Sequence, residues 1–204
     1  MQNGRANLFG SLYAALVVGI SARTFFFFPA TVPTSSMEPA ILKGDTILVD
    51  RLTLAFRRPR RGEIVVFTSP NGISGLPVGR VYVKRLVALG GESVRIGTNW
   101  MVEIDGRLLT AGAPGFEGLY AFAERAPRPG EFHGHANQSL LQEWGGEDVL
   151  SPRFADENAR VQIGRDCVLV LGDNTLVSYD SRAWGDLPMN LVVGRAVLLS
   201  RRFF

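Results

Sequence analysis

The sequence predicts an all-β fold of curled antiparallel sheets, with an irregular insertion in the middle of the chain and one N-terminal transmembrane helix. Short runs rich in β-branched residues recur between glycines and prolines, a pattern typical of strands and turns. No long amphipathic helical pattern separates these runs, which disfavours a parallel sheet covered by helices. An uncharged apolar stretch precedes them near the N-terminus.

The N-terminal segment, residues 1–30, is interpreted as a short cytoplasmic tip followed by a membrane anchor. Residues 8–22 carry no charge, but this stretch is shorter than the roughly 18–20 residues that a spanning helix needs. Counting on to Ala30 gives enough length if the Arg23 guanidinium extends to the membrane interface. A secretory signal peptide that is later removed is the alternative. We favour the anchor because the apolar character continues through residues 25–29.

The first part of the β domain is assigned to residues 31–109. β-branched residues are concentrated in this part, between glycines and prolines, and they predict strands. The expected strands are residues 46–50, 63–67, 80–89, 92–96 and 100–104. After the last of them, Asp105-Gly106 is a two-residue hairpin signal.

Residues 110–164 are interpreted as a variable insertion or cap on the β domain. The strand pattern fades here, and Pro114-Gly115, Pro129-Gly130 and Gly145-Gly146 punctuate the segment. We expect loops and a short helix near residues 139–144. The strand pattern returns in residues 165–204, the second part of the β domain, with strands at residues 166–171 and 191–200.

Composition narrows the class of protein. With 46% apolar and 20% charged residues, the chain has the material for a folded core. The net charge of +3 is modest and no basic run is interleaved with aromatic residues, so no nucleic-acid partner is expected. The single cysteine, Cys167, cannot form an internal disulfide and is expected to be a small core residue.

The two histidines of the chain offer little for metal binding. His133 and His135 flank Gly134 in the irregular middle, without a nearby cysteine or acidic cluster at metal-ligand spacing. We expect both on a surface loop, and the sequence predicts no metal and no cofactor. Only two histidines are present. If a serine of this chain acts as a nucleophile, a lysine is therefore the expected base.

Ser36 is the candidate nucleophile. It lies in Pro33-Thr34-Ser35-Ser36-Met37-Glu38-Pro39, directly after the apolar segment. An isolated serine in such surroundings is usually a turn or cap residue, and a serine needs a neighbouring base to become a nucleophile. The role of Ser36 therefore depends on its partners.

Lys84 is the candidate base. Strand alternation places Tyr82, Lys84, Leu86 and Ala88 on one face of the expected strand at residues 80–89. An isolated lysine in a strand usually extends to water, but loss of water lowers the pKa of a lysine. At a pKa of roughly 8, about 10% of the amine would be neutral at pH 7 and able to accept a proton. The neighbouring Arg85 cannot deprotonate.

Four motifs in this order resemble those of bacterial type I signal peptidases, a family of membrane-anchored Ser/Lys proteases. They are Ser36-Met37-Glu38-Pro39, Gly44-Asp45, Tyr82-Val83-Lys84-Arg85, and Gly172-Asp173-Asn174 followed by Ser178-Tyr179-Asp180-Ser181-Arg182. The resemblance runs from about residue 23 to residue 195, with a middle that does not match. It implies the curled sheets of the signal-peptidase type.

The resemblance implies roles for the residues around the nucleophile. Ser36 would attack, Met37 would pack beside it at the substrate pocket, and Lys84 would be the general base. Ser35, the rival nucleophile, stands where the family usually has glycine and is assigned no chemistry. Thr34 and the backbone N–H of Ser36 would donate hydrogen bonds to the oxyanion.

The resemblance also implies a supporting network. Ser178 would form a hydrogen bond with Lys84, Asp180 and Arg182 would form an ion pair, and Ser181 would support the same network. Residues 175–177 read Thr-Leu-Val where the family typically has Arg-Asp-Asn. This departure removes a charged pair and puts the local rigidity in question.

By resemblance, the chain would be an endopeptidase that removes signal peptides from exported preproteins with small residues before the cut. It would sit as a single-pass protein in the bacterial cytoplasmic membrane, with its β domain on the outer face and lipid as a second partner. Two alternatives stay open. One is a specialised peptidase for a pilin or conjugation protein, and the other is a membrane-anchored β domain that binds a partner without catalysis.

Overall fold

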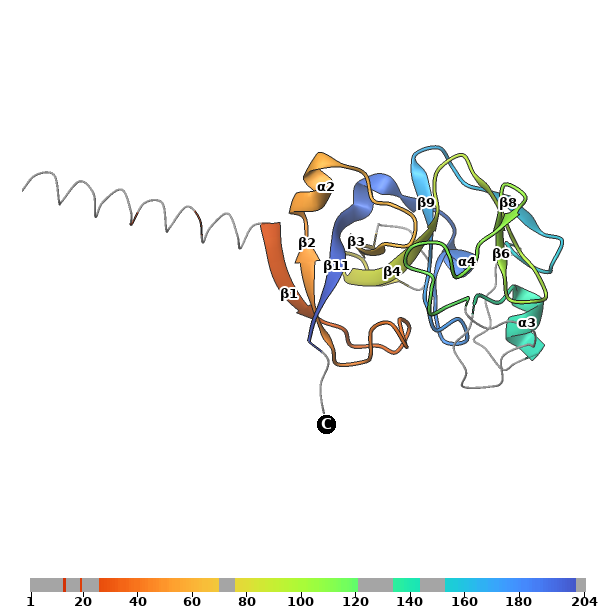
Figure 1. Cartoon of the computed structure of the whole chain (residues 1–204), viewed down its shortest axis with the longest axis horizontal. Helices are drawn as coiled ribbons and strands as arrows, with labels where there is room; N and C mark the ends of the chain where they lie inside the picture. Colours follow the sequence, from red (N-terminus) through yellow and green to blue (C-terminus); the bar gives the residue numbers. More distant parts are fainter. Residues whose placement is uncertain are drawn as a thin grey trace, which may run out of the picture.

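Two antiparallel sheets form the framework of the protein (Figure 1). The structure, a computed structural model, describes Tyr13, Gly19 and residues 26–69, 76–120, 134–143 and 153–200. In Figure 1, β1, β2 and β11 lie on one side of the molecule and β6 and β8 on the other, with β4 and β9 between them. The predicted mostly-β fold with curled antiparallel sheets is confirmed.

The larger sheet has the strand order β1-β2-β11-β3-β4-β9-β10, and its neighbours pair antiparallel. Its strands are β1 (Phe27–Thr31), β2 (Thr46–Asp50), β3 (Ile64–Thr68), β4 (Val81–Ala88), β9 (Cys167–Leu171), β10 (Leu187–Pro188) and β11 (Val192–Ser200). Of the two neighbours of β4, β3 comes shortly before it in the chain and β9 comes from the C-terminal part. This order brings the residues before β2, inside β4 and after β9 into one region.

The smaller sheet has the order β7-β6-β5-β8. Its strands are β5 (Ser93–Ile96), β6 (Val102–Ile104), β7 (Arg107–Leu108) and β8 (Arg160–Gln162). The predicted Asp105-Gly106 hairpin joins β6 to β7 with φ values of 50° and 79°, as a type I′ turn requires. The inner face of this sheet packs with Phe116, Phe154 and Leu169 in one apolar core.

Short helices connect the strands. They are α2 (Leu52–Phe56), α3 (Gln138–Glu143), α4 (Ser181–Trp184) and the 3-10 turn η1 (Met189–Leu191). Helix α3 confirms the short helix expected near residues 139–144. In the described part of the chain, every helix is too short to cross a bilayer.

The end of the predicted N-terminal anchor differs from the structure. Phe27 to Ala30 were assigned to the apolar anchor, but they lie in β1 and pair with β2 from Phe27 opposite Asp50 to Thr31 opposite Thr46. Phe28 and Ala30 pack against the core that contains Met37. Their apolar side chains are therefore part of the packing of the larger sheet. The rest of the predicted anchor, apart from Tyr13, Gly19 and Phe26, lies outside the described residues.

Part of the described middle segment joins the smaller sheet and its core. Strand β8, which was not predicted, pairs with β5, and Phe154 and Ile163 are buried in the core of the smaller sheet. A three-residue strand with an Arg-Val-Gln sequence gives almost no alternation signal. Strand β8 therefore belongs to the smaller sheet, and Phe154 and Ile163 belong to its core.

The predicted face of β4 holds for most of its length. Tyr82 and Leu86 pack in one apolar cluster, whereas Ala88 packs with Val87 in another. The register with β9 shifts between Leu86 and Ala88, and such a bulge interrupts the two-residue period. The placement of Ala88 on the Lys84 face was therefore wrong.

Candidate active site

Ser36 lies in the connection between β1 and β2. Two hydrogen bonds close this connection at its base, from Val32 N to Asp45 O at 2.9 Å and from Gly44 N to Val32 O at 2.8 Å. Within it, Met37 and Ile41 are fully or nearly fully buried in the apolar cluster of Val49 and Val66. Buried side chains directly after Ser36 fix the position of its backbone. The Met37 side chain packs into this cluster, and its role at a substrate pocket stays a prediction.

Lys84 reaches Ser36 from the middle of β4. Its Nζ lies 2.7 Å from Ser36 Oγ and donates a hydrogen bond to it. Lys84 is 5% exposed and Ser36 is 8% exposed. Because β4 is paired on both sides, with Val65 opposite Lys84 in β3 and Leu171 opposite Arg85 in β9, the lysine side chain starts from a rigid strand. The structure brings the two candidate residues together.

The surroundings of Lys84 raise the fraction of its amine that is neutral. Burial lowers the pKa of Lys84 to about 8, and the positive charge of Arg182 adds to this effect. The carboxylates of Asp180 and Asp173 act in the opposite direction, but each is paired with a guanidinium. Loss of water therefore dominates. About 10% of such an amine is neutral at pH 7 and about 90% at pH 9.

The Thr34 hydroxyl lies beside the Ser36 hydroxyl. Its Oγ1 is 3.3 Å from Ser36 Oγ, so a hydroxyl donor stands beside the atom that would attack. The Ser36 N–H donates no hydrogen bond to any residue that the structure describes. Both groups are thus available to a bound oxygen atom.

The turn after β9 packs directly on the nucleophile segment. At Gly172 a Cβ would lie 2.5 Å from the carbonyl oxygen of Ser36 and 2.1 Å from Ser178 Oγ. Only glycine fits such an approach of two backbones. Ser178 Oγ is buried and has no hydrogen-bond partner among the described residues. The expected hydrogen bond between Ser178 and Lys84 is therefore not made, since the hydroxyl rests against Gly172 instead.

Asp180 and Arg182 form the expected ion pair. Arg182 Nη2 lies 2.8 Å from Asp180 Oδ2, and both side chains are almost completely buried. Asp180 also caps α4 by accepting from Arg182 N and accepts from Gly172 N at 2.9 Å. Ser181 Oγ accepts from Val170 N in β9. These bonds fix the turn after β9 relative to α4.

Thr175 takes part in this network, although it is one of the residues that depart from the family pattern. Its Oγ1 accepts from Arg182 Nη1 at 2.6 Å and from Ala136 N at 2.8 Å. Its carbonyl accepts from Arg182 Nη2 at 3.0 Å. Three hydrogen bonds thus hold the segment whose rigidity was in question.

Comparisons with known proteins identify the family of this chain. Residues 5–200 match the family described as signal peptidase, peptidase S26. This chain belongs to that family. A probable signal peptidase I-1 of Synechocystis is 30% identical over 95% of this chain and 79% of its own length. A probable signal peptidase I-2 of the same organism is 27% identical over 91% of this chain and 68% of its own length.

Among solved structures, a signal peptidase I from Enterococcus faecalis is similar to this S26 family member. It is 21% identical, with a TM-score of 0.41, over 71% of this chain and 98% of that chain.

Sequence reasoning missed a second buried ion pair in this signal peptidase family member. Arg85, next to Lys84, donates from Nε and Nη2 to the Asp173 carboxylate at 2.7 and 2.5 Å. Its Nη1 donates to Gly62 O, and its guanidinium stacks over the Phe116 ring. The signal was present in the sequence: an arginine inside an apolar strand has to find an anion when it is buried.

The expected surface position of His135 was wrong. His135 is fully buried, its ring Nδ1 lies 2.7 Å from Tyr120 Oη, and its backbone N–H donates to Trp100 O. Burial lowers the pKa of His135 to about 3, so the imidazole is neutral in the folded protein at ordinary pH. It is a structural core residue, while His133 lies outside the described residues.

Proposed function

We propose that this chain is a serine endopeptidase that removes signal peptides from exported preproteins with a Ser36 nucleophile and a Lys84 general base. The observation that carries the proposal is the 2.7 Å approach of Lys84 Nζ to Ser36 Oγ in a member of the signal peptidase family. A nucleophile within hydrogen-bond distance of a base is the arrangement that acyl transfer needs.

Each step of the reaction moves a proton to or from the Lys84 amine. Neutral Lys84 accepts the Ser36 hydroxyl proton while Ser36 Oγ forms a bond to the scissile carbonyl carbon. The resulting ammonium gives that proton to the nitrogen of the departing mature chain as the peptide bond breaks. Lys84 is neutral again and takes a proton from the water that attacks the acyl-enzyme carbonyl. It then returns this proton to Ser36 Oγ as the ester bond breaks, which restores both residues. Burial of the amine makes its neutral form accessible at moderate pH.

Two donors stabilise the negative charge that forms on the carbonyl oxygen. They are the Thr34 hydroxyl and the Ser36 N–H, both beside Ser36 Oγ. Donors fixed before the reaction lower the barrier because they need no rearrangement when charge develops. The Asp180–Arg182 pair, with Ser181, serves by holding the turn that packs on Ser36.

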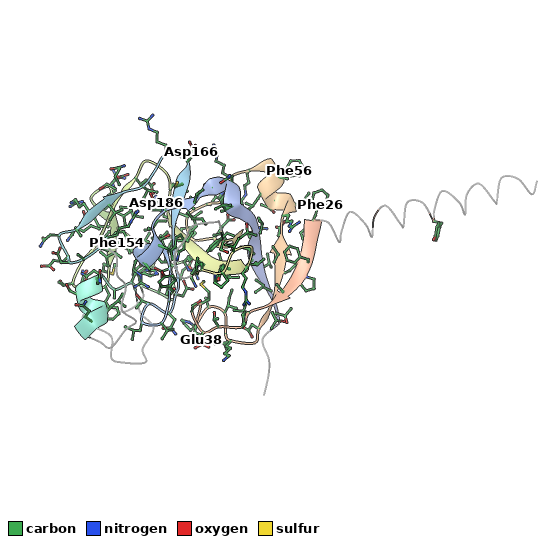
Figure 2. All side chains as sticks on the ribbon, turned by 180° about the vertical axis from the view of Figure 1, so that it is seen from behind. Phe26, Glu38, Phe56, Phe154, Asp166 and Asp186 are labelled. Carbon is green, nitrogen blue, oxygen red and sulfur yellow. The ribbon has the colours of Figure 1, made fainter. Side chains whose placement is uncertain are left out.

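The substrates are exported preproteins with small residues at the first and third positions before the cut. The β domain acts on the outer face of the bacterial cytoplasmic membrane, tethered through its N-terminal segment, with lipid as a second partner. Phe56 of α2 is 84% exposed and lies at the same end of the molecule as Phe26 (Figure 2). An exposed ring two residues before the exposed Arg58 suits contact with lipid headgroups.

Cleavage of a preprotein with an Ala-x-Ala site by the purified full chain tests this function. We expect Ser36→Ala and Lys84→Ala to abolish cleavage. Ser35→Ala is the matched control and should retain most activity, because the Ser35 side chain has no assigned chemistry. Cleavage of a single pilin-like substrate alone would favour the specialised peptidase. Cleavage that survives both Ser36→Ala and Lys84→Ala would exclude the Ser/Lys mechanism.

A further inference from the structure

Asn174 holds the backbone on both sides of the nucleophile. Its side-chain Nδ2 donates to Ser35 O at 3.2 Å, and its backbone N–H donates to Ser36 O at 3.1 Å. Asn174 is 4% exposed, so water does not compete for these bonds. Two successive carbonyl groups are thereby fixed by one residue that lies 139 positions away from Ser35.

The bond to Ser35 O acts on the peptide group that carries the Ser36 N–H. In a trans peptide the C=O and the N–H of one unit are coplanar and point in opposite directions. Fixing the Ser35 carbonyl therefore fixes the direction of the Ser36 N–H. The same carbonyl also accepts from Glu38 N at 3.1 Å, so both of its lone pairs are engaged. Hydrogen bonds to a carbonyl polarise the amide and strengthen its N–H as a donor.

We infer that Asn174 is a positioning residue for the oxyanion donor: its side-chain amide aims and polarises the Ser36 N–H. This inference rests on the proposed function, in which that N–H binds the oxygen of the scissile carbonyl. The Ser36 N–H donates to no described residue, as a donor reserved for substrate requires. Asn174 touches neither the reacting atoms nor Lys84 through any hydrogen bond among the described residues.

Steady-state cleavage by Asn174→Ala tests the inference. The side-chain donor is lost while the backbone bond to Ser36 O is kept. Loss of a complete oxyanion donor lowers kcat by about 100-fold or more, and misalignment of one should lower it by roughly tenfold. We expect KM to stay within about twofold, because the contact forms mainly in the transition state. The apparent pKa of the pH–rate profile should not change, since the Lys84–Ser36 bond is intact.

Two further variants separate positioning from general support. Asn174→Asp keeps the shape but replaces the donor by an oxygen, so its kcat should fall at least as far. Asn137→Ala is the matched control: Asn137 is also buried, and its Nδ2 donates to the carbonyl of Ile96. We expect Asn137→Ala to lower the melting temperature with kcat close to that of the wild type. If Asn174→Ala does not fold, the Asp variant carries the test.

A wild-type kcat in folded Asn174→Ala or Asn174→Asp would overturn the inference. So would a fall in kcat of Asn174→Ala that comes with a shift of the pH–rate midpoint, because in this uncharged variant such a shift would mean a displaced Ser36–Lys84 pair. These outcomes are distinct from failure of the proposed function, which requires that Ser36→Ala and Lys84→Ala remain active.

Discussion

Lys84 Nζ and Ser36 Oγ are hydrogen-bonded at 2.7 Å although 48 positions separate the residues in the chain. The ammonium form donates to the serine oxygen, whereas the neutral amine accepts the serine proton over the same distance. Because burial lowers the pKa of Lys84 to about 8, a small rise in pH converts one form into the other. The proposed proton transfer between these two side chains therefore needs no movement of the backbone.

Burial of the lysine should reduce the stability of the fold at neutral pH. The unfolded chain binds a proton at this site up to its ordinary pKa near 10.5, but the folded chain releases it near 8. The unfolding free energy should therefore rise with pH between 8 and 10.5. We expect Lys84→Met to be more stable than the wild type at pH 7, by at most about 3 kcal/mol.

Urea unfolding of the full chain at several pH values measures this effect. The control is Lys43→Met, at an exposed position and the only other lysine of the chain. A Lys84→Met variant that is less stable than the wild type at pH 7 would show that the lysine is not held at a desolvation cost.

Gly172→Ala should displace the backbone of Ser36, against which Gly172 packs. The new Cβ would lie 2.5 Å from Ser36 O and 2.1 Å from Ser178 Oγ, so the nucleophile segment must move. We expect a loss of about 1–3 kcal/mol of stability and a large loss of cleavage. Gly118→Ala is the matched control, because a Cβ there meets nothing within 4 Å. Normal turnover by Gly172→Ala, measured beside that control, would contradict the described packing.

The Arg85–Asp173 pair should behave as a buried ion pair whose halves depend on each other. Arg85→Met or Asp173→Leu leaves one uncompensated buried charge, and each should cost about 3–5 kcal/mol. The double variant should cost much less than the sum of the two, because no lone charge remains. A double-mutant cycle by urea unfolding measures the coupling, and simple additivity would mean that the two residues do not interact.

Thr175→Val should destabilise the turn that packs on Ser36. Valine has nearly the same shape but cannot accept from Arg182 and Ala136 N. Leaving these buried donors without a partner should cost about 1–3 kcal/mol. Thr98→Val, at an exposed position of the turn before β6, should stay within about 0.5 kcal/mol of the wild type. Equal melting temperatures for the two variants would exclude a structural role for Thr175.

Strands could be predicted from the sequence where a run of β-branched residues also lies in the core of a sheet. Strands β2, β3, β4, β9 and β11 were predicted because β-branched runs lie between glycines and prolines. Strand β1 was hidden because Phe27 to Ala30 continue an apolar run, and hydropathy alone does not separate a core strand from an anchor. Strand β8 was hidden because three residues are too few to show a period.

Among the site residues, the dyad and the Asp180–Arg182 pair could be predicted through resemblance, because their residue types are fixed by their chemistry. The contacts of Thr175 and Ser178 could not be predicted, because they depend on how the turn after β9 packs. Thr175 looked like a loss of charge, yet its hydroxyl oxygen accepts hydrogen bonds from Arg182 Nη1 and Ala136 N. The position of Ser178 Oγ against Gly172 depends on the turn conformation, which no spacing rule specifies.

The dependence of preprotein cleavage on pH, compared between the wild type and Lys84→Arg, tests the Ser/Lys mechanism most directly. Wild-type kcat/KM should rise with pH through an apparent pKa of about 8 and level off above it, since only neutral Lys84 can accept the Ser36 proton. Lys84→Arg should be inactive at every pH, because a guanidinium keeps its charge and cannot act as the base. Robust cleavage by Lys84→Arg, or a wild-type profile flat across this range, would contradict the mechanism.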